Sequence, residues 1–164
     1  EGKRLGAHRL VHNDFTPNFK QTLQPLLDEN NSNPSRISVF NLWRRFDKDG
    51  VDAPFALCDS RTVSEKELIP TDLFNYGKQE ENTETLADEN GFTVEIYQSM
   101  NSDDHQWYFY PKMNREEVVM FKTYDSNEKP FMPTLHSAFD DAVHAREGAT
   151  PRESIEVRAI CFYD

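Results

Sequence analysis

The sequence predicts a mainly β fold, a sandwich or barrel that carries one helix outside it. Three observations lead to this fold class. Short stretches rich in β-branched and aromatic residues recur along the chain between turn-forming residues. Only one stretch has the apolar spacing of an amphipathic helix. The 164 residues, with 12 Phe, 6 Tyr and 2 Trp, suit a single domain over 1–164 with one packed interior.

The helix is predicted over 17–28. Thr16 and Pro17 match an N-cap residue followed by proline at the first helical position. We expect an extended segment over 10–15 before this helix. A loop over 29–35, rich in Asn, Ser and Pro, is expected after it.

The strands are predicted from their β-branched and aromatic content and from the turn residues that bound them. In chain order they are 37–43, 55–59, 92–100, 105–110, 118–124, 134–139 and 154–163. The polar residues 101–104 predict a turn, so 92–100 and 105–110 are expected to form a hairpin. Residues 63–73 are interpreted as an irregular connection. The polar, acidic stretch 75–91 is expected to be a mobile surface loop.

Charge and cysteine content restrict the partners and the compartment. The 29 acidic and 18 basic residues give a net charge of −11, which would repel nucleic acid and anionic membranes, so neither is expected as a partner. No apolar run approaches the roughly 20 residues that span a bilayer. Cys58 and Cys161 lie in apolar, strand-like stretches and are predicted to be buried free thiols. A reducing, cytoplasmic location follows as an expectation.

The candidates for metal chemistry are His12, Asp14 and His136. In an extended segment, residues two apart point to the same face, so His12 and Asp14 can aim at one point. A second imidazole from a facing strand would complete a two-His, one-carboxylate set, which suits Fe(II). Chance alone would give a chain of this composition about one His-x-acid triplet, so a polar turn beside the helix cap explains it equally well.

The last predicted strand carries a second candidate group. Arg152, Ser154 and Arg158 share one face of this strand, because they have the same parity. A guanidinium and a hydroxyl held together form a good receptor for a carboxylate. The same alternation is typical of an edge strand with one wet face, and both interpretations remain open.

Seven stretches, in order along the chain, carry a family resemblance. They are VHNDFTP (11–17), NLWR (41–44), FALCDSR (55–61), WYFYP (107–111), FKTYDS (121–126), HSAFDD (136–141) and PRESIEVR (151–158). Together they resemble the fungal and bacterial hydroxylase/desaturase family, which includes gibberellin desaturase-like proteins and the hydroxylase component of cephamycin methoxylation. The resemblance extends over most of the chain.

This resemblance implies an oxygenase that depends on Fe(II) and 2-oxoglutarate. The implied fold is a double-stranded β-helix, a jelly-roll barrel with one or two flanking helices. The implied iron ligands are His12, Asp14 and His136. Arg152 and Ser154 resemble the Arg-x-Ser pair that binds 2-oxoglutarate in many such enzymes, and Arg158 is a competing anchor.

The implied reaction is the hydroxylation or desaturation of a small organic, secondary-metabolite-like substrate by dioxygen. Such chemistry needs an apolar wall around the metal. The aromatic residues expected there are Trp43, Tyr108, Phe121 and Phe139. Asn41 and Lys122 lie in family-like motifs and are candidate donors to the co-substrate.

The front of the chain departs from the family, whose members are much longer. The His-x-Asp motif begins at residue 12, so the resemblance implies that the N-terminal part of the domain is absent here. The alternative function is therefore a non-catalytic barrel subunit or truncated homologue that acts as a binding or scaffold partner. An incomplete barrel with exposed sheet edges would favour a homo-oligomer or a completing partner chain.

Overall fold

The computed structural model describes residues 9–46, 53–76, 92–141 and 151–164. Their strands are β1 (His12–Asn13), β2 (Arg36–Arg45), β3 (Phe55–Cys58), β4 (Leu68–Tyr76), β5 (Phe92–Ser99), β6 (Trp107–Phe109), β7 (Val119–Asp125), β8 (His136–Ala138) and β9 (Ser154–Tyr163). The helix is α1 (Phe19–Glu29), and two 3-10 turns cover Ser60–Thr62 and Glu65–Glu67. The mainly β prediction with one helix is confirmed.

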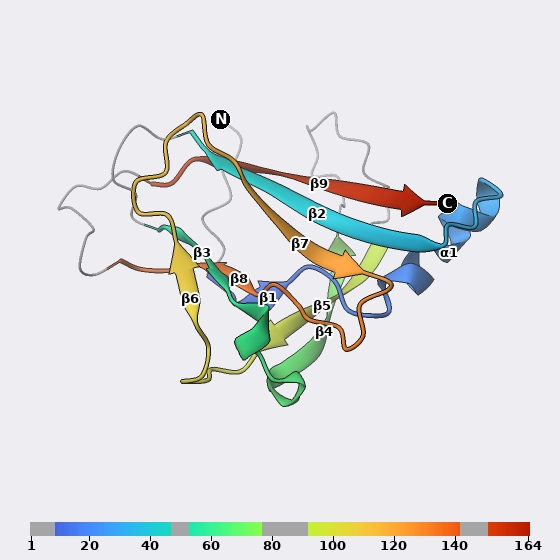
Figure 1. Ribbon diagram of the computed structural model, residues 1–164, viewed down its shortest axis with the longest axis horizontal. Helices are drawn as coiled ribbons and strands as arrows, with labels where there is room; N and C mark the ends of the chain where they lie inside the picture. Colours follow the sequence, from blue (N-terminus) through green and yellow to red (C-terminus); the bar gives the residue numbers. More distant parts are fainter. Residues whose placement is uncertain (1–8, 47–52, 77–91, 142–150) are drawn as a thin grey trace.

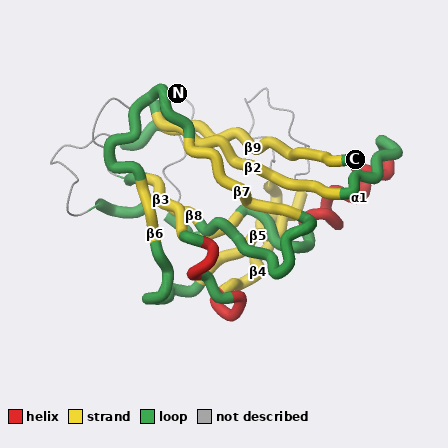
Figure 2. The backbone as a smooth tube through the Cα atoms, viewed as in Figure 1, coloured by secondary structure: helices red, strands yellow, loops and turns green. Residues whose placement is uncertain are grey.

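The strands form two antiparallel sheets. One has six strands in the order β4-β5-β1-β8-β3-β6, and the other has three in the order β7-β2-β9. Figure 1 shows the three-stranded sheet lying across the six-stranded sheet, with α1 at one end, close to the C-terminus. The same view in Figure 2 shows that strands and loops make up most of the described chain.

The central strand of the smaller sheet is β2, which pairs with β9 along all ten of its residues. Side chains alternate between the two faces of a strand. Asn41 lies between Phe121 and Arg158 in the register, so these three side chains form one row on the inner face. Leu42 lies between Met120 and Val157 in the same way, and this second row is on the outer face.

Two apolar clusters fill the interior. The first joins α1 to β2 and consists of Phe15, Phe19, Leu23, Leu27, Ile37, Val39 and Tyr124, with Phe131 packed against it. The second consists of Trp43, Met113 and Phe121, with Phe55, Leu57 and Val119 packed against it. The helix therefore closes one end of the fold, and the second cluster fills the space between the sheets further along β2.

Two sequence predictions for the larger sheet are wrong. Residues 68–76 form β4 instead of part of an irregular connection, and the Pro70 in that stretch is tolerated because β4 is an edge strand. The hairpin of 92–100 with 105–110 does not form, since β5 pairs with β4 and β1 on its two edges while β6 pairs with β3. The predicted loop 75–91 lies outside the described residues from 77 onward.

The thiols and the helices bear on two further predictions. Cys58 and Cys161 are both free, as predicted, with Cys58 buried and Cys161 partly exposed. Among the residues with a described structure, no helix is long and apolar enough to cross a membrane.

Candidate metal centre

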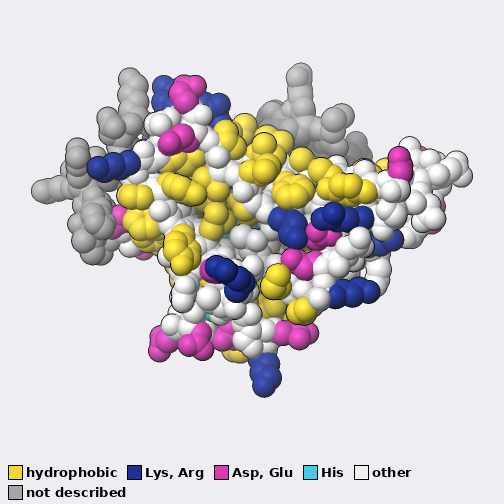
Figure 3. Space-filling view, viewed as in Figure 1, with side chains coloured by type: hydrophobic (Ala, Val, Ile, Leu, Met, Phe, Trp, Pro, Cys, Tyr) yellow, Lys and Arg dark blue, Asp and Glu magenta, His cyan; other side chains and the backbone are white. Residues whose placement is uncertain are grey.

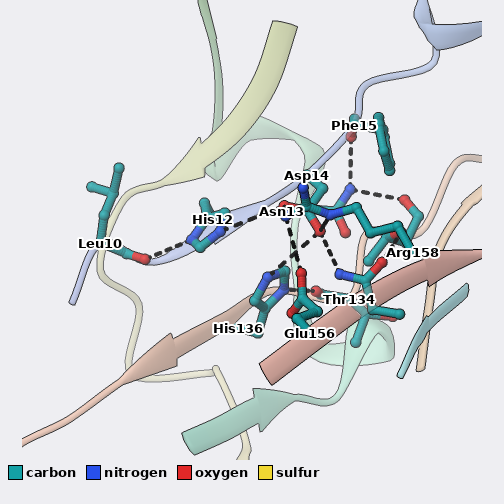
Figure 4. Close-up of polar contacts among 11 residues, drawn as sticks. Leu10, His12, Asn13, Asp14, Phe15, Thr134, His136, Glu156 and Arg158 are labelled. Carbon is teal, nitrogen blue, oxygen red and sulfur yellow. Dashed lines mark hydrogen bonds and ion pairs between the residues drawn. The ribbon is translucent and has the colours of Figure 1, made fainter. Parts of the chain in front are cut away.

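The three candidate ligands come together between the two sheets. His12 on β1 is the direct cross-strand partner of His136 on β8, and their ring centroids are 4.3 Å apart. Asp14 follows the end of β1, on the same face as His12. One ligand atom from each of the three residues lies within 4.8 Å of the other two. Figure 4 shows both imidazoles and the carboxylate turned toward one another.

Each imidazole is held in one tautomer by a backbone carbonyl two residues earlier. His12 Nδ1 donates to the Leu10 carbonyl oxygen at 2.8 Å, and His136 Nδ1 donates to the Thr134 carbonyl oxygen at 3.0 Å. Because Nδ1 is the donor in both rings, Nε2 is the nitrogen that presents a lone pair in the neutral imidazole. The Nε2 atoms of His12 and His136 lie 3.7 and 3.8 Å from the two oxygens of Asp14. This orientation suits metal ligands.

The Asp14 carboxylate is nearly enclosed, with 6% of the residue exposed. Arg158 Nη2 on β9 donates to Asp14 Oδ1 at 2.8 Å, and Arg158 Nε reaches Asp14 Oδ2 at 3.3 Å. Asn41 Nδ2 on β2 donates to the same Oδ2 at 2.5 Å. The smaller sheet therefore supplies two donors to a carboxylate that directly follows β1 of the larger sheet.

Burial and charge fix the protonation states at the site. Burial lowers the pKa of His136 to about 4 despite the attraction of Asp14, so this imidazole is neutral at physiological pH. Burial opposes ionisation of Asp14, but His136, Arg158, His12 and the Asn41 amide outweigh it and lower the pKa of its carboxyl group. The guanidinium of Arg158 is charged at every physiological pH, so it and the Asn41 amide stabilise the ionised Asp14 carboxylate whatever the protonation state of the two imidazoles.

Glu156 is a member of the site that was not predicted. Its Oε1 atom forms an ion pair with Arg158 Nη2 at 3.0 Å. Burial, together with the nearby Asp14 carboxylate, raises the pKa of the Glu156 carboxyl group. It lies two residues before Arg158, so strand alternation places both on the inner face. That parity was the available signal in the sequence.

An aromatic wall stands beside His136. The Phe121 and Phe55 rings lie 5.0 and 5.8 Å from the His136 ring, and Trp43 stacks on Phe55 at 4.5 Å. Trp43 and Phe121, two of the expected wall residues, thus lie on the His136 side of the cluster, together with Phe55, which was not predicted.

Two of the expected wall residues lie elsewhere. Tyr108 is 59% exposed, and Phe139 packs edge-on against Phe109. Tyr108 is therefore not a buried wall residue.

The candidate anchors for a co-substrate occupy different places. Arg152 Nη1 donates to the Ala53 carbonyl oxygen at 2.9 Å, and its guanidinium lies 5.4 Å from the centre of the Trp43 ring. Ser154 is exposed at the start of β9, opposite Arg45. Arg158 contacts Asp14, one of the three candidate ligands.

Of the two candidate donors to a co-substrate, Asn41 contacts Asp14, and Lys122 forms ion pairs with Asp125 and Glu128.

The fold class is that of iron and α-ketoglutarate-dependent oxygenases. The chain superposes over 99% of its length on the solved "iron and alpha-ketoglutarate-dependent endoperoxidase NvfI with different conformation", with a TM-score of 0.71, 28% identity and 56% of that chain covered. A family model described as "Oxidoreductase/YMDC permease-like domain" matches residues 2–162. The chain belongs to this family.

Curated relatives carry the names that the resemblance implied. The chain is 31% identical to "Fe(II)/2-oxoglutarate-dependent dioxygenase nvfI" of Aspergillus novofumigatus, over 94% of this chain and 52% of that protein. It is 27% identical to "Hydroxylase/desaturase asaB" of Aspergillus flavus, over 79% of this chain and 57% of that protein. The resemblance to the hydroxylase/desaturase family is thus confirmed. The chain spans about half the length of the curated relatives it matches.

Proposed function

We propose that this chain carries the iron site of an Fe(II)/2-oxoglutarate-dependent oxygenase, with His12, Asp14 and His136 as the ligands. The observation that carries the proposal is the pair of cross-strand imidazoles whose Nε2 atoms face one buried carboxylate. Two neutral nitrogens and one carboxylate oxygen fit Fe(II) and leave coordination positions for a co-substrate and dioxygen. The substrate is a small organic, secondary-metabolite-like molecule that is hydroxylated or desaturated.

When bound, iron with 2-oxoglutarate and dioxygen supplies the oxidation of an unactivated C–H bond. The protein supplies position and shielding. The Leu10 and Thr134 carbonyl groups accept hydrogen bonds from the Nδ1 atoms and so aim both Nε2 atoms inward. Trp43, Phe55 and Phe121 form an apolar surface that excludes water on the His136 side.

The co-substrate requires a cation for its distal carboxylate. We propose that Arg152 and Ser154 anchor it, with Arg158 as the competing anchor. Arg152 lies over Trp43 of the aromatic wall, which supports the first assignment. The contacts of Arg158 with Asp14 and Glu156 support a different role for that residue, in neutralising the two carboxylates.

The activity test is formation of succinate from 2-oxoglutarate by the chain with added Fe(II). We expect succinate in the wild type and none with His136→Ala. A matched control is His105→Asn, because His105 is also buried but is paired with Glu67, outside the ligand cluster. Turnover that survives in His136→Ala would contradict the ligand assignment.

We also propose that this chain associates, either with copies of itself as a homo-oligomer or with a partner chain that completes the barrel. The alternative function, a non-catalytic binding subunit, would also require such a partner. In the described part of the chain β9 pairs only with β2, so its other edge is available for pairing. Met120 and Val157, on the outer face, are 66% and 56% exposed. Figure 3 shows hydrophobic side chains gathered over this sheet. An exposed apolar area of this kind favours association.

Light scattering over a range of concentrations tests the partner proposal. We expect the average mass to rise with concentration, and Val157→Lys to hold it at the monomer value. A monomer at every concentration would contradict self-association.

We also propose that the protein is located in the cytoplasm, since both cysteines are free thiols. Cell fractionation with an antibody to the chain tests that location.

A further inference from the structure

Among the three candidate ligands, Asp14 is the one that the sheet does not hold in place. His12 and His136 are direct partners in the β1–β8 ladder, which fixes the backbone positions from which both imidazoles project. The ladder of β1 ends at Asn13, and Asp14 lies beyond it. The direction of the Asp14 carboxylate therefore depends on side-chain contacts.

Asn41 is placed to provide the most rigid of these contacts. It lies in the middle of β2, paired on both sides with Phe121 and Arg158, and is 0% exposed. Its Nδ2 atom donates to Asp14 Oδ2 at 2.5 Å. The other donor, Arg158, has a longer side chain that is 35% exposed. A short, buried amide on a central strand has fewer rotamers than a long, partly exposed arginine.

Thr123 supports the orientation in which the Nδ2 end of the Asn41 amide faces the carboxylate. Its hydroxyl donates to Asn41 Oδ1 at 3.2 Å, which leaves Nδ2 pointing at Asp14. An amide turned the other way would place an oxygen against a carboxylate oxygen, a repulsive contact. Thr123 is 1% exposed, so water does not compete for this hydrogen bond.

A β-bulge gives Thr123 a second function. The β2–β7 register shifts between Val39 and Phe40, whose partners are Tyr124 and Lys122, so Thr123 lies between two paired residues. Its carbonyl oxygen accepts a hydrogen bond from Asn13 Nδ2 at 3.0 Å. The bulge thus ties down the residue before Asp14 and also orients the amide that holds the Asp14 carboxylate. Bulges commonly re-aim side chains beside active sites in this way.

We propose that Asn41, oriented by Thr123, is a positioning residue that aims the Asp14 carboxylate at the metal. The inference rests on the proposed iron site. Loss of a hydrogen-bonding partner of a metal ligand typically weakens metal binding by about 10- to 100-fold. Asn41→Ala should weaken binding in that range. Thr123→Val keeps the shape and the bulge carbonyl but removes the hydroxyl, so it should weaken binding in the same direction by less.

The probe is Co(II), which substitutes for iron without needing turnover. Titration calorimetry gives the dissociation constant, and the ligand-field absorption of Co(II) reports its coordination. We expect both to change in Asn41→Ala and in Thr123→Val, and to stay at wild-type values in Thr123→Ser, which restores the hydroxyl. The matched control is Ser38→Ala, a buried change on the same strand that removes a hydrogen bond to the Tyr163 hydroxyl, away from Asp14.

The outcomes separate this inference from the iron site itself. Wild-type Co(II) affinity and spectrum in Asn41→Ala and Thr123→Val would overturn the positioning role and leave the ligand assignment standing. A wild-type chain that binds no Co(II) would refute the iron site and this inference together. If Asn41→Ala does not fold, the comparison of Thr123→Val with Thr123→Ser tests the proposal alone. Equal Co(II) affinities in these two variants would overturn it.

Discussion

Acid should destabilise this fold through one imidazole. His136 is 3% exposed, and its pKa is lowered to about 4 from the ordinary value of 6.5. Between these two values the unfolded chain binds a proton that the native protein does not. The free energy of unfolding must therefore fall as the pH drops below 6.5.

The magnitude follows from the size of the pKa shift. One pKa unit corresponds to about 1.4 kcal/mol, so lowering the pH from 7 to 5 should cost about 2 kcal/mol through His136 alone. Other carboxyl and imidazole groups also titrate in this range. The informative quantity is thus the difference between the wild type and His136→Asn, a variant that keeps a donor for the Thr134 carbonyl but has no proton to gain.

Urea unfolding of the EDTA-treated protein, followed by tryptophan fluorescence, measures this difference. We expect the wild type to lose about 2 kcal/mol more than His136→Asn between pH 7 and pH 5. Above pH 7 the two proteins should respond to pH in parallel, which is the internal control. Equal losses in both proteins between pH 7 and pH 5 would refute the assignment of a buried, neutral imidazole.

Three further outcomes are expected. Arg152→Gln and Arg158→Gln should differ in the apparent KM for 2-oxoglutarate, measured by succinate formation. Substitution of the true anchor should raise this KM by about 10- to 100-fold, because it removes a charged hydrogen bond. A small and similar change in both variants would contradict both assignments. Trp43→Ala should lower the free energy of unfolding in urea by about 3–5 kcal/mol, since it opens a cavity beside Phe55 and Phe121, and a loss below about 1 kcal/mol would count against a packed wall. Added Co(II) should raise the Tm of the wild type in a thermal scan but leave that of His136→Ala unchanged, because only a ligand bound by the native state stabilises it.

The sequence predicts the bounds of a helix or strand well where the residues of that segment alone determine its structure. The bounds of β9 coincide with the predicted strand 154–163, and α1 differs from the predicted 17–28 by two residues at its start and one at its end. The juxtaposition of the His12 and His136 imidazoles was also anticipated, from the resemblance and the alternation of strand side chains. Local composition and parity thus predicted much of the fold and the centre of the site.

Pairing between distant segments was harder to predict. The turn at 101–104 was correctly seen as polar, but no local pattern indicates that β4 and β1 already occupy both edges of β5. The chain leaving β5 is instead held by Glu67, whose carbonyl accepts from the Met100 amide and whose carboxylate pairs with His105. Likewise, the contact of Asn41 with Asp14 joins two sheets and depends on the Thr123 bulge, which has no sequence signature here.

The His12–His136 pair in the β1–β8 ladder also constrains how the protein matures. Its two members lie 124 residues apart in the sequence, so the stretch between them must be synthesised before they can meet. Contacts between such distant segments form slowly, because the intervening loop has to be closed first. We therefore expect the proposed metal site to form only after this loop has closed, and the rate of cobalt binding after dilution from urea would measure that closure.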